Sequence, residues 1–133
     1  MTQIIVHTTE NGNVALTIPT GELPINEVLE KDCPNHAIII DDSELPQGAD
    51  RLFFDAWELD SNKKITINFS KAQAIKLSQY NANALIEAQK RQLNTLSGVN
   101  NSISDADFLA KLNVGRNAIA NAKTTDELVN INN

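Results

Sequence analysis

Six carboxylates are the side chains whose types and spacing could carry chemistry. They are Asp41, Asp42, Glu44, Asp55, Glu58 and Asp60. Asp41 and Asp42 directly follow an apolar run, a position where metal-dependent nucleases and transferases often place carboxylates. With Lys63 and Lys64 just beyond Asp60, such a group would suit phosphodiester hydrolysis.

Turn chemistry explains the same residues more simply. The segments Asp41–Pro46 and Asp60–Lys63 are rich in Asp, Ser, Asn and Pro, the residues that tight turns favour. The five glycines are scattered singly, so no phosphate-binding loop is formed, and no nucleophile motif is present. The sequence therefore predicts a protein without catalytic residues.

Cys33 and His36 form a C-x-x-H pair, which is at best half of a zinc site. His7 is distant in sequence and no second ligand pair occurs, so we expect neither a metal ion nor another cofactor. The single cysteine cannot form an internal disulfide, which fits a reducing compartment.

The first part of the chain has the pattern of a small sheet. Two strands, Gln3–His7 and Val14–Ile18, flank Asn11-Gly12, a strong hairpin signal because both residues tolerate positive φ. A short helix is predicted over Ile25–Lys31 and ends before Pro34. The apolar, β-branched run Ala37–Ile40 is predicted to be the central strand.

A second hairpin is predicted from Arg51–Leu59 and Lys64–Phe69. This part of the chain holds four of the six aromatic residues, which we expect to anchor the core. The expected anchors are Phe53, Phe54, Trp57 and Phe69.

The remaining sequence lacks proline and is predicted to be helical. Helices are expected over Lys71–Leu96 and Asp105–Ala122, with a last turn at Asp126–Ile131. Three hydroxyl residues, Ser70, Ser104 and Thr124, each precede an acid or amide by three positions, as helix N-caps do. The prediction is an α+β protein with a small antiparallel or mixed sheet of two hairpins, a central strand and a short helix (residues 1–69), followed by a C-terminal helical hairpin (70–133).

The long helix also contains a heptad-spaced seam with glutamine at two positions. The seam residues are Ala72, Ile75, Gln79, Ala82, Ile86, Gln89, Leu93 and Leu96. An amphipathic helix packed on the second helix is favoured, with pairing to another copy or a partner as the alternative. The candidate interaction residues are Ile75, Ile86, Leu93, Leu96, Phe108 and Leu112. Gly115 within the second helix predicts a close helix contact.

Charge is divided unevenly along the chain. Residues 1–67 hold four Lys and Arg against twelve Asp and Glu, a net charge of −8, whereas residues 68–133 hold seven against five, a net charge of +2. An acidic first half repels phosphate backbones, so nucleic-acid binding is not expected. No segment has the roughly 18 consecutive apolar residues of a membrane span, so a membrane partner is not expected either.

Four segments together resemble small proteins encoded in the tail modules of tailed bacteriophages and prophages, described as tail-fibre assembly or tail-assembly-chaperone-like proteins. The segments are PNHAIIIDDSELP (34–46), RLFFDAWEL (51–59), ITINFSKAQAI (65–75) and TTDEL (124–128). The best-matching positions are Arg51, Ala56, Trp57, Lys71 and Ala72. The relatives are rich in Arg and Glu in the long helix, whereas this chain has Gln, Ala and Asn there, so an assembly mode that used those arginines would differ here.

The resemblance implies a structural or assembly role in a phage tail, without enzymatic activity, cofactor or small ligand. The implied partner is a tail or tail-fibre protein or a second copy of the chain, in the host cytoplasm or on the virion tail. The alternative is a small phage-encoded inhibitor of a host defence system or enzyme that uses its acidic surface.

Overall fold

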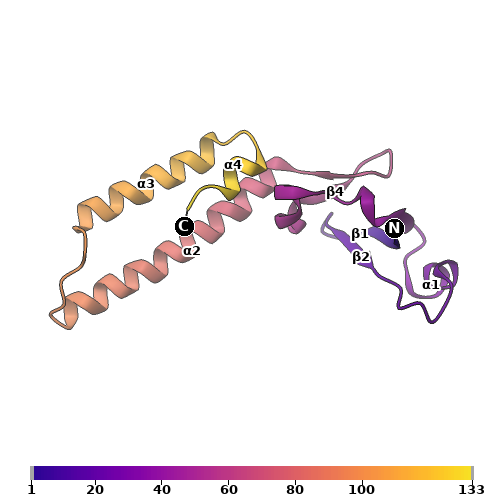
Figure 1. Cartoon of the computed structure of the whole chain (residues 1–133), viewed down its shortest axis with the longest axis horizontal. Helices are drawn as coiled ribbons and strands as arrows, with labels where there is room; N and C mark the ends of the chain where they lie inside the picture. Colours follow the sequence, from indigo (N-terminus) through magenta and orange to yellow (C-terminus); the bar gives the residue numbers. More distant parts are fainter. Residues whose placement is uncertain (1, 133) are drawn as a thin grey trace. The chain divides into compact units, whose positions relative to one another are not determined.

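The computed structural model describes residues 2–132 and shows an α+β protein with two compact units, residues 1–69 and 70–133 (Figure 1). We call them the sheet unit and the helical unit. The sheet unit contains five short strands and one α-helix, and the helical unit consists of α-helices alone within the described residues.

The sheet unit is built on a three-stranded antiparallel sheet in the order β2-β1-β3. The strands are β1 (Gln3–Thr8), β2 (Val14–Thr17) and β3 (Ile38–Asp41). The predicted first hairpin is confirmed: Thr9 N–H donates to the Asn13 carbonyl at 2.8 Å, and Gly12 has φ of +84°. A left-handed backbone of this kind is the reason for glycine in the turn.

The prediction of a central β3 is wrong, because β1 occupies the centre of the sheet. β1 pairs with β2 along one edge and with β3 along the other, so β3 is an edge strand. A β-branched apolar run favours a strand but does not determine the strand's neighbours, and Ile4, Ile5 and Val6 of β1 are equally apolar and fully buried.

A short helix and three 3₁₀ turns connect the strands. Helix α1 (Ile25–Asp32) lies where it was predicted and ends at Cys33, whose extended backbone precedes Pro34. The 3₁₀ turns are Asp42–Glu44, Gly48–Leu52 and Phe54–Ala56.

The predicted strand over Arg51–Leu59 exists only in its last three residues, as β4 (Trp57–Leu59). The preceding residues are bonded locally instead, since Phe53 N–H donates to the Asp50 carbonyl and Ala56 N–H to the Phe53 carbonyl. β4 pairs antiparallel with β5 (Ile65–Ile67), which confirms the second hairpin in a shorter form.

The aromatic residues of this region have different environments. Phe53 and Trp57 are buried, and Phe69 is half-buried at the start of the long helix. Phe54 is expected in the core but is 39% exposed, with its ring tilted against Trp57 at a centroid distance of 4.9 Å. Phe53 and Trp57 are four residues apart and would share one face of a strand, whereas Phe54 would lie on the other face, so its exposure also fits strand alternation.

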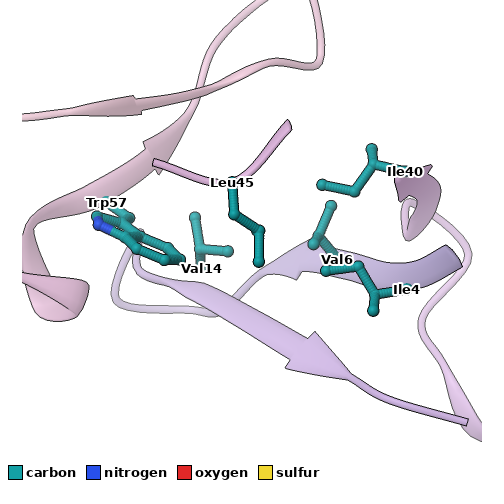
Figure 2. Packing of buried hydrophobic residues seen from close by; sticks show 6 residues of the cluster. All are labelled: Ile4, Val6, Val14, Ile40, Leu45 and Trp57. Carbon is teal, nitrogen blue, oxygen red and sulfur yellow. The ribbon is translucent and has the colours of Figure 1, made fainter. Parts of the chain in front are cut away.

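One apolar cluster joins both sheets of the sheet unit (Figure 2). Its buried members are Ile4, Val6, Val14, Ile40, Leu45 and Trp57. The alternating residues of β1 and β3 point to the same side of the sheet, as the two-residue repeat of a strand requires. Trp57 also donates its indole N–H to the Asp50 carbonyl at 2.9 Å, so its polar atom is satisfied while the ring is 2% exposed.

The helical unit consists of α2 (Phe69–Leu96), α3 (Asp105–Asn121) and α4 (Thr125–Val129), with α2 and α3 forming an antiparallel hairpin (Figure 1). The cap prediction is confirmed for α3, where Ser104 Oγ accepts from Asp107 N–H at 3.1 Å, and for α4, where Thr124 Oγ1 accepts from Glu127 N–H at 3.2 Å. The prediction is wrong for Ser70, because α2 already begins at Phe69 and Ser70 is a helical residue.

We expect Trp57→Ala to lower the free energy of unfolding by about 3–5 kcal/mol, because a fully packed ring is removed from the cluster. Trp57→Phe keeps most of the apolar contact and loses the hydrogen bond to Asp50, so its cost should be smaller. Urea unfolding followed by circular dichroism measures both, and Phe54→Ala is the control for an exposed aromatic side chain. Equal effects of Trp57→Ala and Phe54→Ala, or indole emission that iodide quenches freely, would contradict this position of Trp57.

Candidate interaction surface of the helical unit

Three of the six carboxylates singled out by sequence, Asp41, Glu44 and Asp60, hold turns together. Asp41 Oδ1 accepts from Ser43 N–H at 3.1 Å and Glu44 Oε2 accepts from Asp41 N–H at 3.0 Å, a capping box around a 3₁₀ turn. The Ser43 N–H lowers the pKa of Asp41 because it stabilises the ionised carboxylate. Asp60 Oδ1 likewise accepts from the N–H groups of Asn62 and Lys64, at 2.8 and 2.9 Å.

Cys33 and His36, the C-x-x-H pair of the sequence, have separate protein partners. Cys33 Sγ lies 3.9 Å from Thr17 Oγ1, and His36 Nε2 lies 3.0 Å from the Thr8 carbonyl oxygen. The ring of His36 also meets that of His7 edge-on at 5.9 Å. Within residues 2–132, no three His, Cys, Asp or Glu side chains come close enough together to hold a metal ion.

One face of α2 carries long polar side chains that bind backbone carbonyls of the rest of the helical unit. Gln73 Nε2 donates to the Ile119 carbonyl at 3.1 Å, and Tyr80 Oη donates to the carbonyls of Lys111 and Leu112, both at 3.4 Å. At the other end of the hairpin, Arg91 Nη2 donates to the Ile103 carbonyl at 3.0 Å. These contacts fix the antiparallel alignment of α2 and α3.

Arg91 is a buried cation with three kinds of partner. Besides the Ile103 carbonyl, its guanidinium forms an ion pair with Asp105 and lies over the ring of Phe108, 4.9 Å from the centroid. Burying an unpaired charge would be strongly unfavourable, so these contacts account for an arginine in this position. The cation thereby joins α2, the connecting loop and the first turn of α3.

Tyr80 and Gly115 form the close helix contact that sequence predicted at Gly115. A Cβ atom built on Gly115 would overlap the hydroxyl and ring edge of Tyr80. Gly115 has an ordinary helical backbone, so space for the tyrosine ring, and not backbone conformation, explains the glycine.

Lys76 connects α2 to the end of the chain. Its side chain is buried and its Nζ donates to the Ile131 carbonyl at 2.8 Å. Burial lowers the pKa of Lys76, because the charged ammonium is less stable away from water.

Helix α2 packs on α3 as predicted, but it does so through its polar face. Its apolar seam mostly points away from α3, so the expectation that this seam makes the contact is wrong. Side chains advance by about 100° per residue, which places the middle and end of the seam roughly opposite Gln73, Tyr80 and Arg91. We call these outward residues, with the adjoining Leu85, the outer stripe: Ala82, Leu85, Ile86, Gln89, Leu93 and Leu96, all of them exposed. Of the earlier seam residues, Ala72 is buried and Ile75 half-buried.

The predicted interaction residues therefore lie in two places. Phe108 and Leu112 are half-buried on the side of α3 that faces α2, whereas Leu93 and Leu96 belong to the outer stripe and are 63% and 78% exposed. Ile86 lies at the border between the two. The polar residues by which α2 contacts the rest of the helical unit were not predicted, although their positions 73, 76, 80 and 91 share one helix face and could have indicated it.

A groove of about 600 Å³ opens between α2 and α3. Its apolar lining includes Ile86, Ile103, Phe108 and Leu112, and its polar lining includes Glu87, Lys90 and Lys111. The side chains of both lysines are exposed. The groove thus combines an apolar floor with two cationic groups and could bind an apolar segment that carries acidic residues.

No protein-family model matches this chain, and no curated protein or solved structure is significantly similar to it. Among the described residues, no helix is both long and apolar enough to cross a membrane.

We expect Gly115→Ala to destabilise the helical unit by about 1–3 kcal/mol, because the methyl group displaces the Tyr80 ring from its two carbonyl partners. The helix-propensity gain of about 1 kcal/mol opposes this effect. Asn113→Ala, at an exposed site of the same helix, is the control and should be neutral or slightly stabilising. Thermal unfolding by circular dichroism compares them. A Gly115→Ala variant more stable than the wild type would show that the tyrosine adapts without cost.

Because of Lys76, the free energy of unfolding should change with pH in the alkaline range. Its pKa in the folded protein lies below the ordinary value of 10.5, so between the two pKa values the unfolded chain binds more protons. The free energy of unfolding contributed by this group is therefore lowest at neutral pH and rises as pH increases toward 10.5. Chemical unfolding at several pH values should show this rise in the wild type relative to Lys76→Met. Parallel pH profiles of the two proteins would contradict the assignment.

Proposed function

We propose that this protein is a non-enzymatic tail-associated structural or tail-fibre assembly protein of a bacteriophage, and that it acts by binding another protein through its helical unit. The observation that carries the proposal is the amount of exposed apolar side chain on this unit. The exposed large apolar residues of the unit are Leu77, Leu85, Ile86, Leu93, Leu96, Val99, Ile103, Leu109, Val114 and Val129. Extended apolar surface on a water-soluble unit typically marks a site of protein association.

The environment of the carboxylates supports a role without catalysis. A general acid or base, or a metal ligand, needs a carboxylate directed at the reacting group. Asp41 and Asp60 are instead directed at backbone N–H groups of their own turns. This supports a binding role for the chain.

The groove between α2 and α3 is the proposed partner site. Its apolar floor suits an apolar side chain or short helix, and Lys90 and Lys111 favour a partner segment with acidic residues beside it. The resemblance of the segments 34–46, 51–59, 65–75 and 124–128 to tail-module proteins supports a tail or tail-fibre protein as the partner. Binding would take place in the host cytoplasm during assembly, and the complex could persist on the tail.

A second function is favoured by a different observation, the net charge of −8 on residues 1–67. A compact, strongly acidic unit can imitate nucleic acid on the basic surface of a host defence protein. In that function the groove would be irrelevant, and charge reversal on the sheet unit would abolish activity.

The test is deletion of the gene from its phage or prophage, followed by complementation. We expect particles without the gene to lack tail fibres or intact tails in electron micrographs, and the wild-type gene to restore them. Purified Lys90→Glu/Lys111→Glu protein should bind the tail-fibre protein at least about tenfold more weakly. Lys123→Glu, an exposed lysine outside the groove lining, is the matched control and should bind normally.

Normal, infectious particles from the deletion strain would falsify the tail function. Reduced growth only on hosts that carry an intact defence system, with normal particle morphology, would establish the inhibitor instead.

A further inference from the structure

The outer stripe of α2 is a regular apolar surface without a partner in the described part of the chain. Ala82, Ile86, Gln89, Leu93 and Leu96 follow one another at intervals of four, three, four and three residues. This repeat, averaging about 3.5 residues, matches the seam by which one helix packs along another. At about 1.5 Å per residue the stripe runs for roughly 21 Å along the helix.

No other helix within residues 2–132 is available to cover this stripe. α3 packs against the opposite face of α2, as the Tyr80–Gly115 and Arg91–Phe108 contacts show. α1 has eight residues and α4 has five, so neither matches the length of the stripe. The groove and the stripe lie on different faces of α2 and have only Ile86 in common.

We propose that the outer stripe binds the same stripe of a second copy, so that the protein forms a two-fold symmetric dimer through α2. The inference goes beyond the proposed function, since it involves a different surface and needs no phage partner. Gln89 favours a second copy over an apolar partner. Opposite an apolar helix its amide would lose hydrogen bonds to water without replacement, whereas opposite its own equivalent each amide can donate to the other.

The outer stripe is uncharged, which is compatible with self-association. No Lys, Arg, Asp or Glu occurs at the stripe itself, and Lys90, four residues after Ile86, is a charged residue at its border. The charged residues of this part of the helix, Glu87, Lys90 and Arg91, line the groove instead. The stripe itself therefore offers nothing that would select an acidic or basic partner.

An antiparallel arrangement of the two helices fits best. The residues that precede α2 carry a net charge of −8, and a parallel pair would attach two such units at the same end of the dimer. With Gln89 on the symmetry axis of an antiparallel pair, Ala82 lies opposite Leu96 of the second copy and Leu85 opposite Leu93. On each side of the axis, one small–large pair and one pair of leucines then lie along the seam.

The dimer should be weak. The large apolar side chains of the stripe are Leu85, Ile86, Leu93 and Leu96, each exposed by half or more. Together they offer less than the roughly 800 Å² per partner of a standard protein interface. We expect a dissociation constant on the order of micromolar or weaker.

Sedimentation equilibrium of the full chain, from about 5 to about 500 µM, tests the dimer in a range that brackets such a constant. The wild type should shift from monomer to dimer, and Leu93→Glu should weaken association by about tenfold or more. Val114→Glu is the matched control, because Val114 is 69% exposed on α3, away from the stripe, and should associate like the wild type. Circular dichroism should show equal helix content in all three proteins, since both substituted side chains are exposed.

Cysteine cross-linking tests the orientation, in a Cys33→Ser background. Ala82→Cys protein mixed with Leu96→Cys protein should form a disulfide-linked heterodimer on mild oxidation, because these positions face each other only in the antiparallel pair. A wild-type protein that stays monomeric at the highest concentration, or equal effects of Leu93→Glu and Val114→Glu, would overturn the dimer. Efficient cross-linking of Leu96→Cys protein with itself, and none in the mixture, would overturn the antiparallel arrangement.

Discussion

The arrangement of the helical unit depends on the donor side chains of one face of α2. Gln73, Lys76, Tyr80 and Arg91 each donate to a backbone carbonyl of α3, the connecting loop or the chain end. Buried donors and acceptors are costly without partners, so these bonds determine which face of α2 meets α3. The apolar stripe on the opposite face then remains exposed, and the association proposed for this protein follows from that orientation.

The two units are stabilised by different physical means. The sheet unit has a conventional apolar cluster in which alternate residues of β1 and β3 pack with Leu45 and Trp57. The helical unit has few large buried apolar residues, among them Ile119 and Leu128, and relies on polar contacts and on the fit of Tyr80 against Gly115. A unit that buries little apolar surface gains stability from binding a partner or a second copy, because association covers what folding leaves exposed.

The two proposed binding surfaces, the groove and the outer stripe, lie on different faces of α2. The groove has an apolar floor with Lys90 and Lys111, and so offers both shape and charge to a partner. The outer stripe has no charge and a regular repeat, and so fits a helix like itself. A dimer through the stripe would leave most of the groove lining open, so one assembly could present two copies of the partner site.

The sequence by itself determined the features that depend on neighbouring residues. The Asn11-Gly12 turn, the end of α1 before Pro34, and the caps at Ser104 and Thr124 need only local backbone chemistry, and the structure has them where predicted. Tertiary structure decided the strand order, the 3₁₀ path over residues 48–56, and the direction of the α2 seam. These features depend on contacts between distant segments, such as Arg91 with Ile103 and Asp105, or Trp57 with Asp50. Periodicity shows that a helix has an apolar face, but the hydrogen bonds available to its polar face decide which way that apolar face points.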